Sequence, residues 1–163
     1  MHGLGPEERE LLEYAALLHD VGYHISRSSH HKHSHYLIQN ADLRGFQPEE
    51  IEIMAFAARY HRGALPKKKH TDFQSLPKER REKILKLAAL LRLAEGLDRS
   101  HFQNVENLDV ELDDETLTLT LHTRTDPQLD VWGTRRDSDL FEHVYGRKVK
   151  ITASEQVPAE AGS

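Results

Sequence analysis

The sequence contains no cysteine among its 163 residues. Disulfides, thiolate metal sites and cysteine nucleophiles are therefore excluded together, and any metal ion must be held by imidazole and carboxylate groups. Aromatic residues are also scarce, at 7% of the chain with a single tryptophan. Histidine is the exception, because the chain has twelve of them, enough to build a metal site from imidazole.

Long apolar runs are missing as well. No stretch approaches the roughly 18 apolar residues that a membrane span needs, and the first ten residues, MHGLGPEERE, lack the basic and apolar regions of a signal peptide. We therefore expect a cytoplasmic protein that has no membrane partner. The formal net charge of -5 argues against general affinity for nucleic acid, so we expect no specific nucleic-acid partner, although a local basic patch can still attract a polyanion.

Apolar residues recur at helical spacing over the first hundred residues. This spacing predicts helices that begin at Pro6, at about His33, at Pro48 and at Pro77. After residue 100 the apolar period changes to two on either side of DDET, which predicts a β-hairpin. A helix over 126–145 and a strand at RKVKIT are expected to follow. The predicted fold is mostly α, with a small C-terminal α/β portion that contains the hairpin.

Three segments follow from this pattern. Residues 1–104 form the helical portion, and residues 105–152 form the hairpin, helix and strand packed on it. Residues 153–163, which include SEQVPAEAGS, have the composition of a disordered tail. Trp132 and Phe141 lie at helical spacing in the second segment, and we expect both to be core anchors rather than stacking surfaces.

A histidine-rich segment, LLHDVGYHISRSSHHKHSHYLI, begins with adjacent His19 and Asp20 at the end of an apolar helix. Such a pair can hold metal, because an imidazole nitrogen binds one ion while two carboxylate oxygens can bridge two cations. The alternative is an ordinary surface or hydrogen-bonded pair. Asp98 ends the apolar stripe of the long helix, where a carboxylate is costly to bury unless a cation or a hydrogen-bond network meets it.

Five segments of the chain occur in the same order in one known family: LLEYAALLHDVGYHIS, HHKHSHYLI, ARYHRG, KLAALLRLAEGLDRS and DLFEHVYGRKVKI. Through them the chain resembles, over about residues 2–152, the C-terminal region of the exopolyphosphatase and guanosine pentaphosphate phosphatase family. The helical part of that region is similar to the HD superfamily of metal phosphohydrolases. The resemblance therefore implies an HD-domain-like helical bundle. In full-length relatives, two N-terminal actin-like domains precede this region and hold the main phosphatase site.

The resemblance also implies metal ligands, residue by residue. They are His19, Asp20, His30, His61 and Asp98. HD phosphohydrolases usually take a further histidine from a helix upstream of the His-Asp pair, and this sequence has none in that place. The implied cofactor is a divalent metal, one of Mg, Mn, Fe or Zn, in an incomplete site. For the middle histidines the alternative is a solvated helix start, with His31, His33 and His35 exposed or beside the ligands.

Basic residues cluster next to the predicted ligand His61. Lysine offers a point charge and arginine a planar fork for phosphate oxygens, so a polyphosphate chain can lie across this segment. The predicted polyphosphate-binding residues are Arg59, Arg62, Lys67, Lys68, Lys69, Arg80 and Arg81. A solvated basic loop is the alternative.

Two functions of different classes remain. In the first, the chain is a hydrolase module that binds and guides polyphosphate or guanosine pentaphosphate and supports homodimer contacts, while the actin-like domains cleave. In the second, it is an autonomous metal-dependent phosphohydrolase that acts on nucleotides or phosphate esters. We favour the first because the ligand set is incomplete. The isolated chain is then expected to be inactive or weakly active, and no catalytic residue is assigned.

Overall fold

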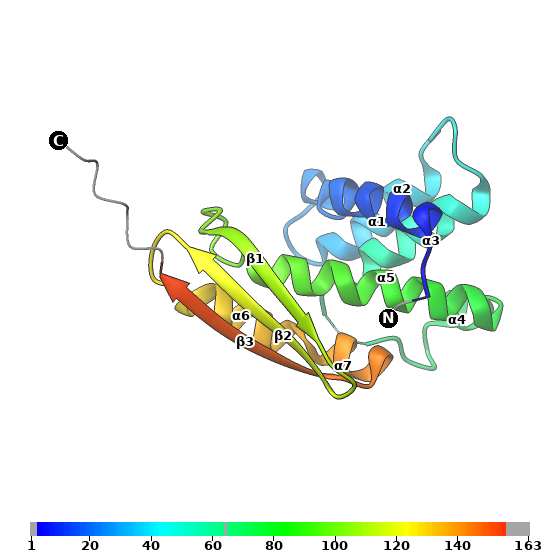
Figure 1. Ribbon diagram of the computed structural model, residues 1–163. Helices are drawn as coiled ribbons and strands as arrows, with labels where there is room; N and C mark the ends of the chain where they lie inside the picture. The colour runs from blue at the N-terminus through cyan, green and yellow to red at the C-terminus, as the bar shows by residue number, and fades with distance from the viewer. Residues whose placement is uncertain (1–2, 64, 156–163) are drawn as a thin grey trace. The chain divides into compact units, whose positions relative to one another are not determined.

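The computed structural model describes residues 3–63 and 65–155, and the chain divides into two compact units, Met1–Arg92 and Leu93–Ser163. In chain order the first unit holds α1 (Pro6–Leu18), the 3₁₀ helix η1 (Val21–His24), α2 (His30–Asn40), α3 (Pro48–Tyr60), α4 (Thr71–Gln74) and most of α5 (Lys78–Leu97) (Figure 1). The second unit holds the rest of α5, β1 (Val105–Leu112), β2 (Thr116–Thr123), α6 (Gln128–Asp137), α7 (Asp139–Tyr145) and β3 (Lys148–Glu155). The predicted mostly helical fold with a small C-terminal sheet is confirmed.

The core of the first unit is built around α3. Every residue of this helix from Ile53 to Ala58 is buried, and α1 and α2 both pack against it. Three of these six residues are alanines, whose small side chains let neighbouring helices approach closely. The buried residues are Leu11 and Ala15 on α1, and His30, Ser34 and Ile38 on α2. As a result, the ends of these three helices are held in fixed positions.

Local sequence determines where α1 and α3 begin. Each has proline near its first position, and in each a glutamate at the third position accepts a hydrogen bond from the residue before the helix. Glu8 Oε2 accepts from the backbone N–H of Gly5, and Glu50 Oε2 accepts from that of Gln47, both at 2.7 Å. These bonds satisfy backbone donors that have no partner inside the helix.

The sheet of the second unit has the order β1-β2-β3. β1 and β2 form the predicted antiparallel hairpin, whose turn is closed by Asp113 Oδ1 accepting from the backbone N–H groups of Glu115 and Thr116. β3 pairs in parallel with the other edge of β2, and α6 and α7 form the connection between the two strands. The leucines of β2 are buried, whereas Val110 and Leu112 of β1 are exposed.

One expectation for this unit is confirmed with a difference, and one is wrong. The segment expected to be helical over 126–145 is helical from Gln128 to Tyr145, but it is divided into two helices at Ser138, where Ser138 Oγ donates to the carbonyl of Arg135 and Asp139 Oδ1 accepts from the N–H of Leu140. Phe141 is fully buried as expected, but Trp132 is 53% exposed, and the guanidinium of Arg136 lies over its ring. Helical spacing alone did not reveal which side of α6 faces the core.

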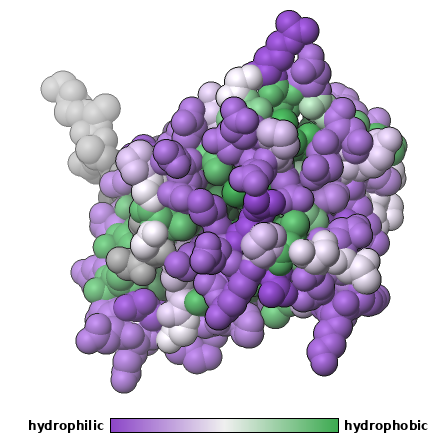
Figure 2. Space-filling view, turned by 90° about the vertical axis from the view of Figure 1, so that its right-hand side faces the viewer, coloured by the Kyte–Doolittle hydropathy of each residue, from purple (hydrophilic) through white to green (hydrophobic). Residues whose placement is uncertain are grey.

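The predicted tail over 153–163 is only partly described, since β3 continues to Glu155 and residues 156–163 lie outside the described residues. Among the described helices, none has the length and apolar character needed to cross a membrane. Figure 2 shows one face of the molecule, where hydrophilic side chains predominate and hydrophobic ones are confined to small areas between them.

Candidate metal centre and cationic pocket

Four predicted metal ligands lie at the ends of helices in the first unit. His19 follows the last residue of α1, Asp20 precedes η1, His30 is the first residue of α2, and His61 follows the last residue of α3. Because α1 and α2 pack on α3, these ends meet. His30 and His61 are buried, while the side chains of His19 and Asp20 are 19% and 33% exposed.

The ligand atoms converge on the carboxylate of Asp20. Its Oδ1 lies 3.1 Å from Nε2 of His30 and 3.8 Å from Nε2 of His61, and its Oδ2 lies 3.5 Å from Nε2 of His19. The Nε2 atoms of His30 and His61 are 3.3 Å apart. The ligand atoms of His19, Asp20 and His61 all lie within 4.8 Å of one another. We call His19, Asp20, His30 and His61 the metal centre.

The other ring nitrogen of His19 and of His61 determines the orientation of each ring. Nδ1 of His19 lies 2.6 Å from the carbonyl of Ala16, and Nδ1 of His61 lies 2.5 Å from the carbonyl of Ala58. A carbonyl only accepts, so each Nδ1 donates its hydrogen, and each Nε2 keeps a lone pair for a metal ion. This arrangement is the one that histidine ligands usually adopt in metal sites.

A close backbone contact positions the loop that carries Asp20. The backbone N–H of Gly22 donates to Ser34 Oγ at 2.9 Å, which joins η1 to the middle of α2. A Cβ at position 22 would lie 2.2 Å from the carbonyl oxygen of His30, so only glycine fits. On the same loop, the ring of Tyr23 stacks on the imidazole of His30 with their centroids 4.0 Å apart. The contact of Gly22 with α2 and the stacking of Tyr23 on His30 therefore fix the positions of Asp20 and His30 relative to each other.

The residues of the metal centre fit a divalent cation. Asp20 Oδ1 is a buried acceptor that receives no hydrogen bond within the described residues, although Nε2 of His30 lies 3.1 Å away. Ligand atoms that bind one ion at about 2.0–2.2 Å lie roughly 3.0–3.5 Å from one another. The pairs His30–Asp20, His30–His61 and His19–Asp20 fall within this range at 3.1, 3.3 and 3.5 Å, and the pair His61–Asp20 is slightly wider at 3.8 Å. Three imidazoles and a carboxylate are a donor set that Zn²⁺, Mn²⁺ and Fe²⁺ accept.

The fifth predicted ligand, Asp98, belongs to the second unit. There its Oδ1 accepts a hydrogen bond from the backbone N–H of Gln103 at 3.0 Å. Its role as a metal ligand stays a prediction.

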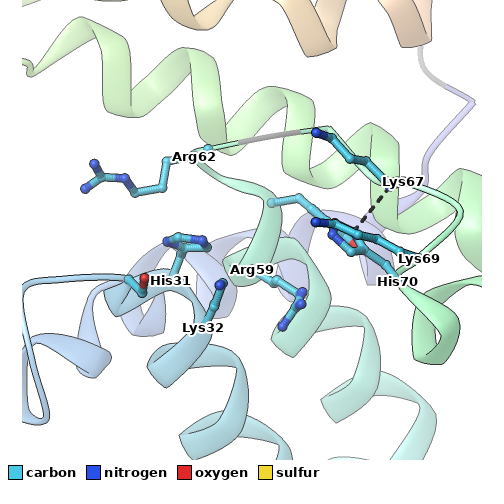
Figure 3. Close-up of a pocket in the computed structure, with 10 residues that line it drawn as sticks. His31, Lys32, Arg59, Arg62, Lys67, Lys69 and His70 are labelled. Atoms are coloured by element: carbon cyan, nitrogen blue, oxygen red, sulfur yellow. Dashed lines mark hydrogen bonds between the residues drawn. The ribbon is translucent and has the colours of Figure 1, made fainter.

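A cationic pocket lies beside the metal centre in the first unit. Its volume is about 280 Å³. Five cationic side chains line it: Lys32, Arg59, Arg62, Lys67 and Lys69. They come from α2, from the end of α3 and from the loop that follows, and they surround the pocket from both sides (Figure 3). No carboxylate is among the lining residues that the structure describes.

Two histidines in the cationic pocket have lowered pKa values. Burial, and next the charge of Arg62, lower the pKa of His31 to about 4. Burial, and next the charge of Arg59, lower the pKa of His70 as well. Nδ1 of His70 accepts a hydrogen bond from the backbone N–H of Lys67 and also lies 3.0 Å from the hydroxyl of Tyr60. These contacts fix the wall of the pocket that presents Lys67.

The sequence and the structure differ in the extent of the basic cluster. Lys68 is exposed and does not line the pocket. Arg80 forms ion pairs with Glu49 and Glu52 at 2.7 and 2.8 Å, and Arg81 donates to Gln74. Their predicted contacts with polyphosphate have no support from the pocket.

Sequence reasoning missed Lys32, which lines the cationic pocket. The one available signal was its place in the first turn of a helix, two residues after a predicted ligand histidine.

Comparison with known proteins gives a consistent answer. The family model described as Ppx/GppA phosphatase, domain III, matches residues 2–131. Over 119 residues the chain is 32% identical to the guanosine-5'-triphosphate,3'-diphosphate pyrophosphatase of Aeromonas hydrophila and 30% identical to that of Aeromonas salmonicida. Each match covers 69% of this chain and 22% of the relative. A protein of the same name from Pseudoalteromonas translucida is 37% identical over 57 residues, which cover 35% of this chain and 12% of that protein. The chain therefore spans about a fifth of the length of the two Aeromonas proteins, and less of the third.

Proposed function

The chain belongs to the Ppx/GppA phosphatase family, whose domain III it matches, and from this premise we propose that it binds a phosphoanhydride chain and guides it to the hydrolysing part of a larger enzyme. The ligand class is polyphosphate or a guanosine nucleotide with several phosphates. The observation that carries the proposal is the cationic pocket. Homodimer contacts, which the family resemblance implies, belong to the same proposal and can be checked by light scattering.

The charges of the pocket support an anionic ligand. Five cationic side chains line one volume in which the described residues place no carboxylate, so they repel one another until an anion enters. The pocket also includes Ser29 and His31 at the start of α2, where the helix dipole favours negative charge. Arginine forks and lysine point charges together match the oxygens of successive phosphate groups.

His31 adds hydrogen bonding to the pocket without adding charge. The pKa of His31 is about 4, so at neutral pH its imidazole is uncharged. Nδ1 of His31 is buried and makes no hydrogen bond within the described residues, which leaves it available to a ligand or a bound water. The pocket thus has a polar wall as well as a charged one, as a site for phosphate oxygens requires.

The metal centre favours a second candidate, a metal-dependent phosphohydrolase. A divalent ion held by Asp20 and the three histidines would polarise a phosphoryl oxygen and lower the pKa of a bound water. Asp20 and His19 are partly exposed, so a ligand can reach this position. We place this candidate second because the described residues give the first proposal a pocket lined by five cationic side chains, whereas only a group of ligand atoms supports the metal-dependent reaction.

The first proposal is tested by two single substitutions in one loop. Lys67 lines the pocket, and Lys68, its neighbour, does not. Lys67→Ala should weaken binding of tripolyphosphate by about 1 kcal/mol, roughly a fivefold higher Kd, and reduce its dependence on salt. Lys68→Ala removes the same charge and should change the Kd by less than about twofold. Calorimetry at several salt concentrations measures both, and equal effects of the two substitutions would show diffuse attraction in place of pocket binding.

The second candidate is tested by phosphate release. We expect the isolated chain to release little phosphate from polyphosphate or guanosine pentaphosphate in the presence of Mg²⁺ or Mn²⁺. Metal-dependent release that disappears in Asp20→Ala and in Asp98→Ala would instead establish the phosphohydrolase. Circular dichroism must show that each variant stays folded, because lost activity could otherwise reflect lost structure.

A further inference from the structure

Arg62 belongs to both sites of the first unit. Its side chain lines the cationic pocket, and its Nη1 lies 3.4 Å from Nδ1 of the metal ligand His30. The guanidinium therefore lies on the side of this imidazole that faces away from Asp20, whose Oδ1 is 3.1 Å from Nε2. A single imidazole ring separates the charge of Arg62 from the place of a metal ion.

Nδ1 of His30 has two competing partners. It lies 3.3 Å from the carbonyl of Arg27, which can only accept, and 3.4 Å from Arg62 Nη1, which can only donate. If Nδ1 carries the hydrogen, it donates to Arg27, and Nε2 has a free lone pair. If Nδ1 accepts from Arg62, the hydrogen of the neutral ring must be on Nε2.

The second arrangement is incompatible with metal binding. With its hydrogen on Nε2, His30 donates to Nε2 of His61, 3.3 Å away, whose own hydrogen is committed to the carbonyl of Ala58. A nitrogen that carries a hydrogen has no lone pair for a metal ion. The contact with Arg62 therefore removes His30 from the ligand set, and the contact with Arg27 restores it.

The positive charge of Arg62 also opposes metal binding. The guanidinium is always protonated and repels a cation at the metal centre across one ring. An anion in the cationic pocket neutralises that charge, and its oxygens compete with His30 Nδ1 for the N–H groups of Arg62. Both effects favour metal binding when the pocket is filled.

We propose that Arg62 couples the two sites, so that a phosphate-like anion in the cationic pocket increases the affinity of the metal centre for a divalent cation. By thermodynamic linkage, the cation increases the affinity for the anion by the same factor. The proposal rests on the proposed function, because it requires that the pocket binds such anions. Arg62 is thus a positioning residue that acts on the metal ion through His30.

The test measures binding of Mn²⁺ to the full 163-residue chain through the electron paramagnetic resonance signal of the free ion. Sulfate is the anion probe, because it complexes Mn²⁺ far less than polyphosphate does, and chloride keeps the ionic strength constant. Saturating sulfate should lower the Kd for Mn²⁺ by roughly fivefold or more. Calorimetry with sulfate should give the reciprocal change when Mn²⁺ is present.

Substitution of Arg62 should change the Mn²⁺ affinity in a way that loss of a purely structural contact would not. Without sulfate, Arg62→Ala should bind Mn²⁺ more tightly than the unaltered chain, because the repelling charge and the donor to His30 are both gone. Sulfate should then leave the Mn²⁺ affinity of this variant unchanged. Lys32→Ala is the matched control: it removes another cation of the pocket, so it should weaken sulfate binding but keep the coupling at saturating sulfate.

The possible failures are distinguishable. If sulfate binds and the Mn²⁺ affinity does not change, or if Arg62→Ala keeps the full coupling, the inference is wrong and the proposed function is unaffected. If neither sulfate nor tripolyphosphate binds to the pocket, both are wrong. If Mn²⁺ does not bind under any condition, the coupling is refuted while the pocket can still bind its anion.

Discussion

Replacing Gly22 by alanine should disrupt the metal centre without touching a ligand. The new Cβ would lie 2.2 Å from the carbonyl oxygen of His30 and 2.5 Å from the backbone nitrogen of Ser34. Both atoms belong to the backbone of α2, so they cannot rotate away as a flexible side chain could. The loop that carries Asp20 must therefore move away from α2 by about 1 Å to restore normal contact distances.

The size of the effect follows from these contacts. Forcing a methyl group into a packed site costs about 1–3 kcal/mol. The displacement also breaks the buried hydrogen bond from Gly22 N–H to Ser34 Oγ, which costs about 1–3 kcal/mol when the donor is left without a partner. The reduced freedom of the unfolded chain returns about 0.4–1 kcal/mol. We expect a net loss of about 3 kcal/mol in the free energy of unfolding and a 10- to 100-fold weaker affinity for Mn²⁺.

Urea unfolding followed by circular dichroism measures the stability, and the paramagnetic resonance titration measures the affinity. Gly45→Ala is the matched control, because nothing lies within 4 Å of a Cβ there and its φ of +98° gives backbone strain alone. That control should cost about 1–2 kcal/mol and leave Mn²⁺ binding unchanged. The reasoning is refuted if Gly22→Ala stays within about 0.5 kcal/mol of the unaltered chain or binds Mn²⁺ equally well.

Two further predictions concern the pH dependence and the core. Burial lowers the pKa of His35 from 6.5 to about 4, so between these pH values the unfolded chain binds more protons than the folded chain. The free energy of unfolding should therefore fall as the pH drops from about 6.5 to about 4. In urea unfolding, the His35→Gln variant should show a weaker dependence of this free energy on pH. Phe141→Ala should lower the free energy of unfolding by about 3–5 kcal/mol because its ring is fully buried. Trp132→Ala, at a 53% exposed position, should change it by less than about 1 kcal/mol. Equal losses in urea unfolding would contradict the difference in burial between the two rings.

The elements that the sequence predicted well are those whose signals are local. Proline at the start of α1 and α3 fixes where each helix begins, and the alternating leucines on both sides of DDET indicate the hairpin. The short helix α4 carried no usable period over its four residues. The break at Ser138 depends on single hydrogen bonds between side chains and the backbone, which periodicity does not reveal.

The candidate site was predictable in its ligand types but not in its contacts. His19 and Asp20 are adjacent in the chain, so their proximity could be foreseen, and the family resemblance supplied His30 and His61. The contact of Arg62 with His30 joins residues 32 positions apart, and nothing in either local sequence indicates it. Tertiary packing of α2 on α3 creates this contact.

The hydrogen bonds from His19 to Ala16 and from His61 to Ala58 each close within four consecutive residues. Both rings are therefore oriented by their own helix ends before any ion arrives, and an incoming ion need not wait for them to rotate. Binding of an ion to these two ligands requires no rearrangement of the protein, so its rate is governed by diffusion and by loss of water from the ion. For this first step, ions that exchange their water slowly should bind slowly, and the order of rates among divalent metals should follow the ion; only the later contact with His30 depends on the protein.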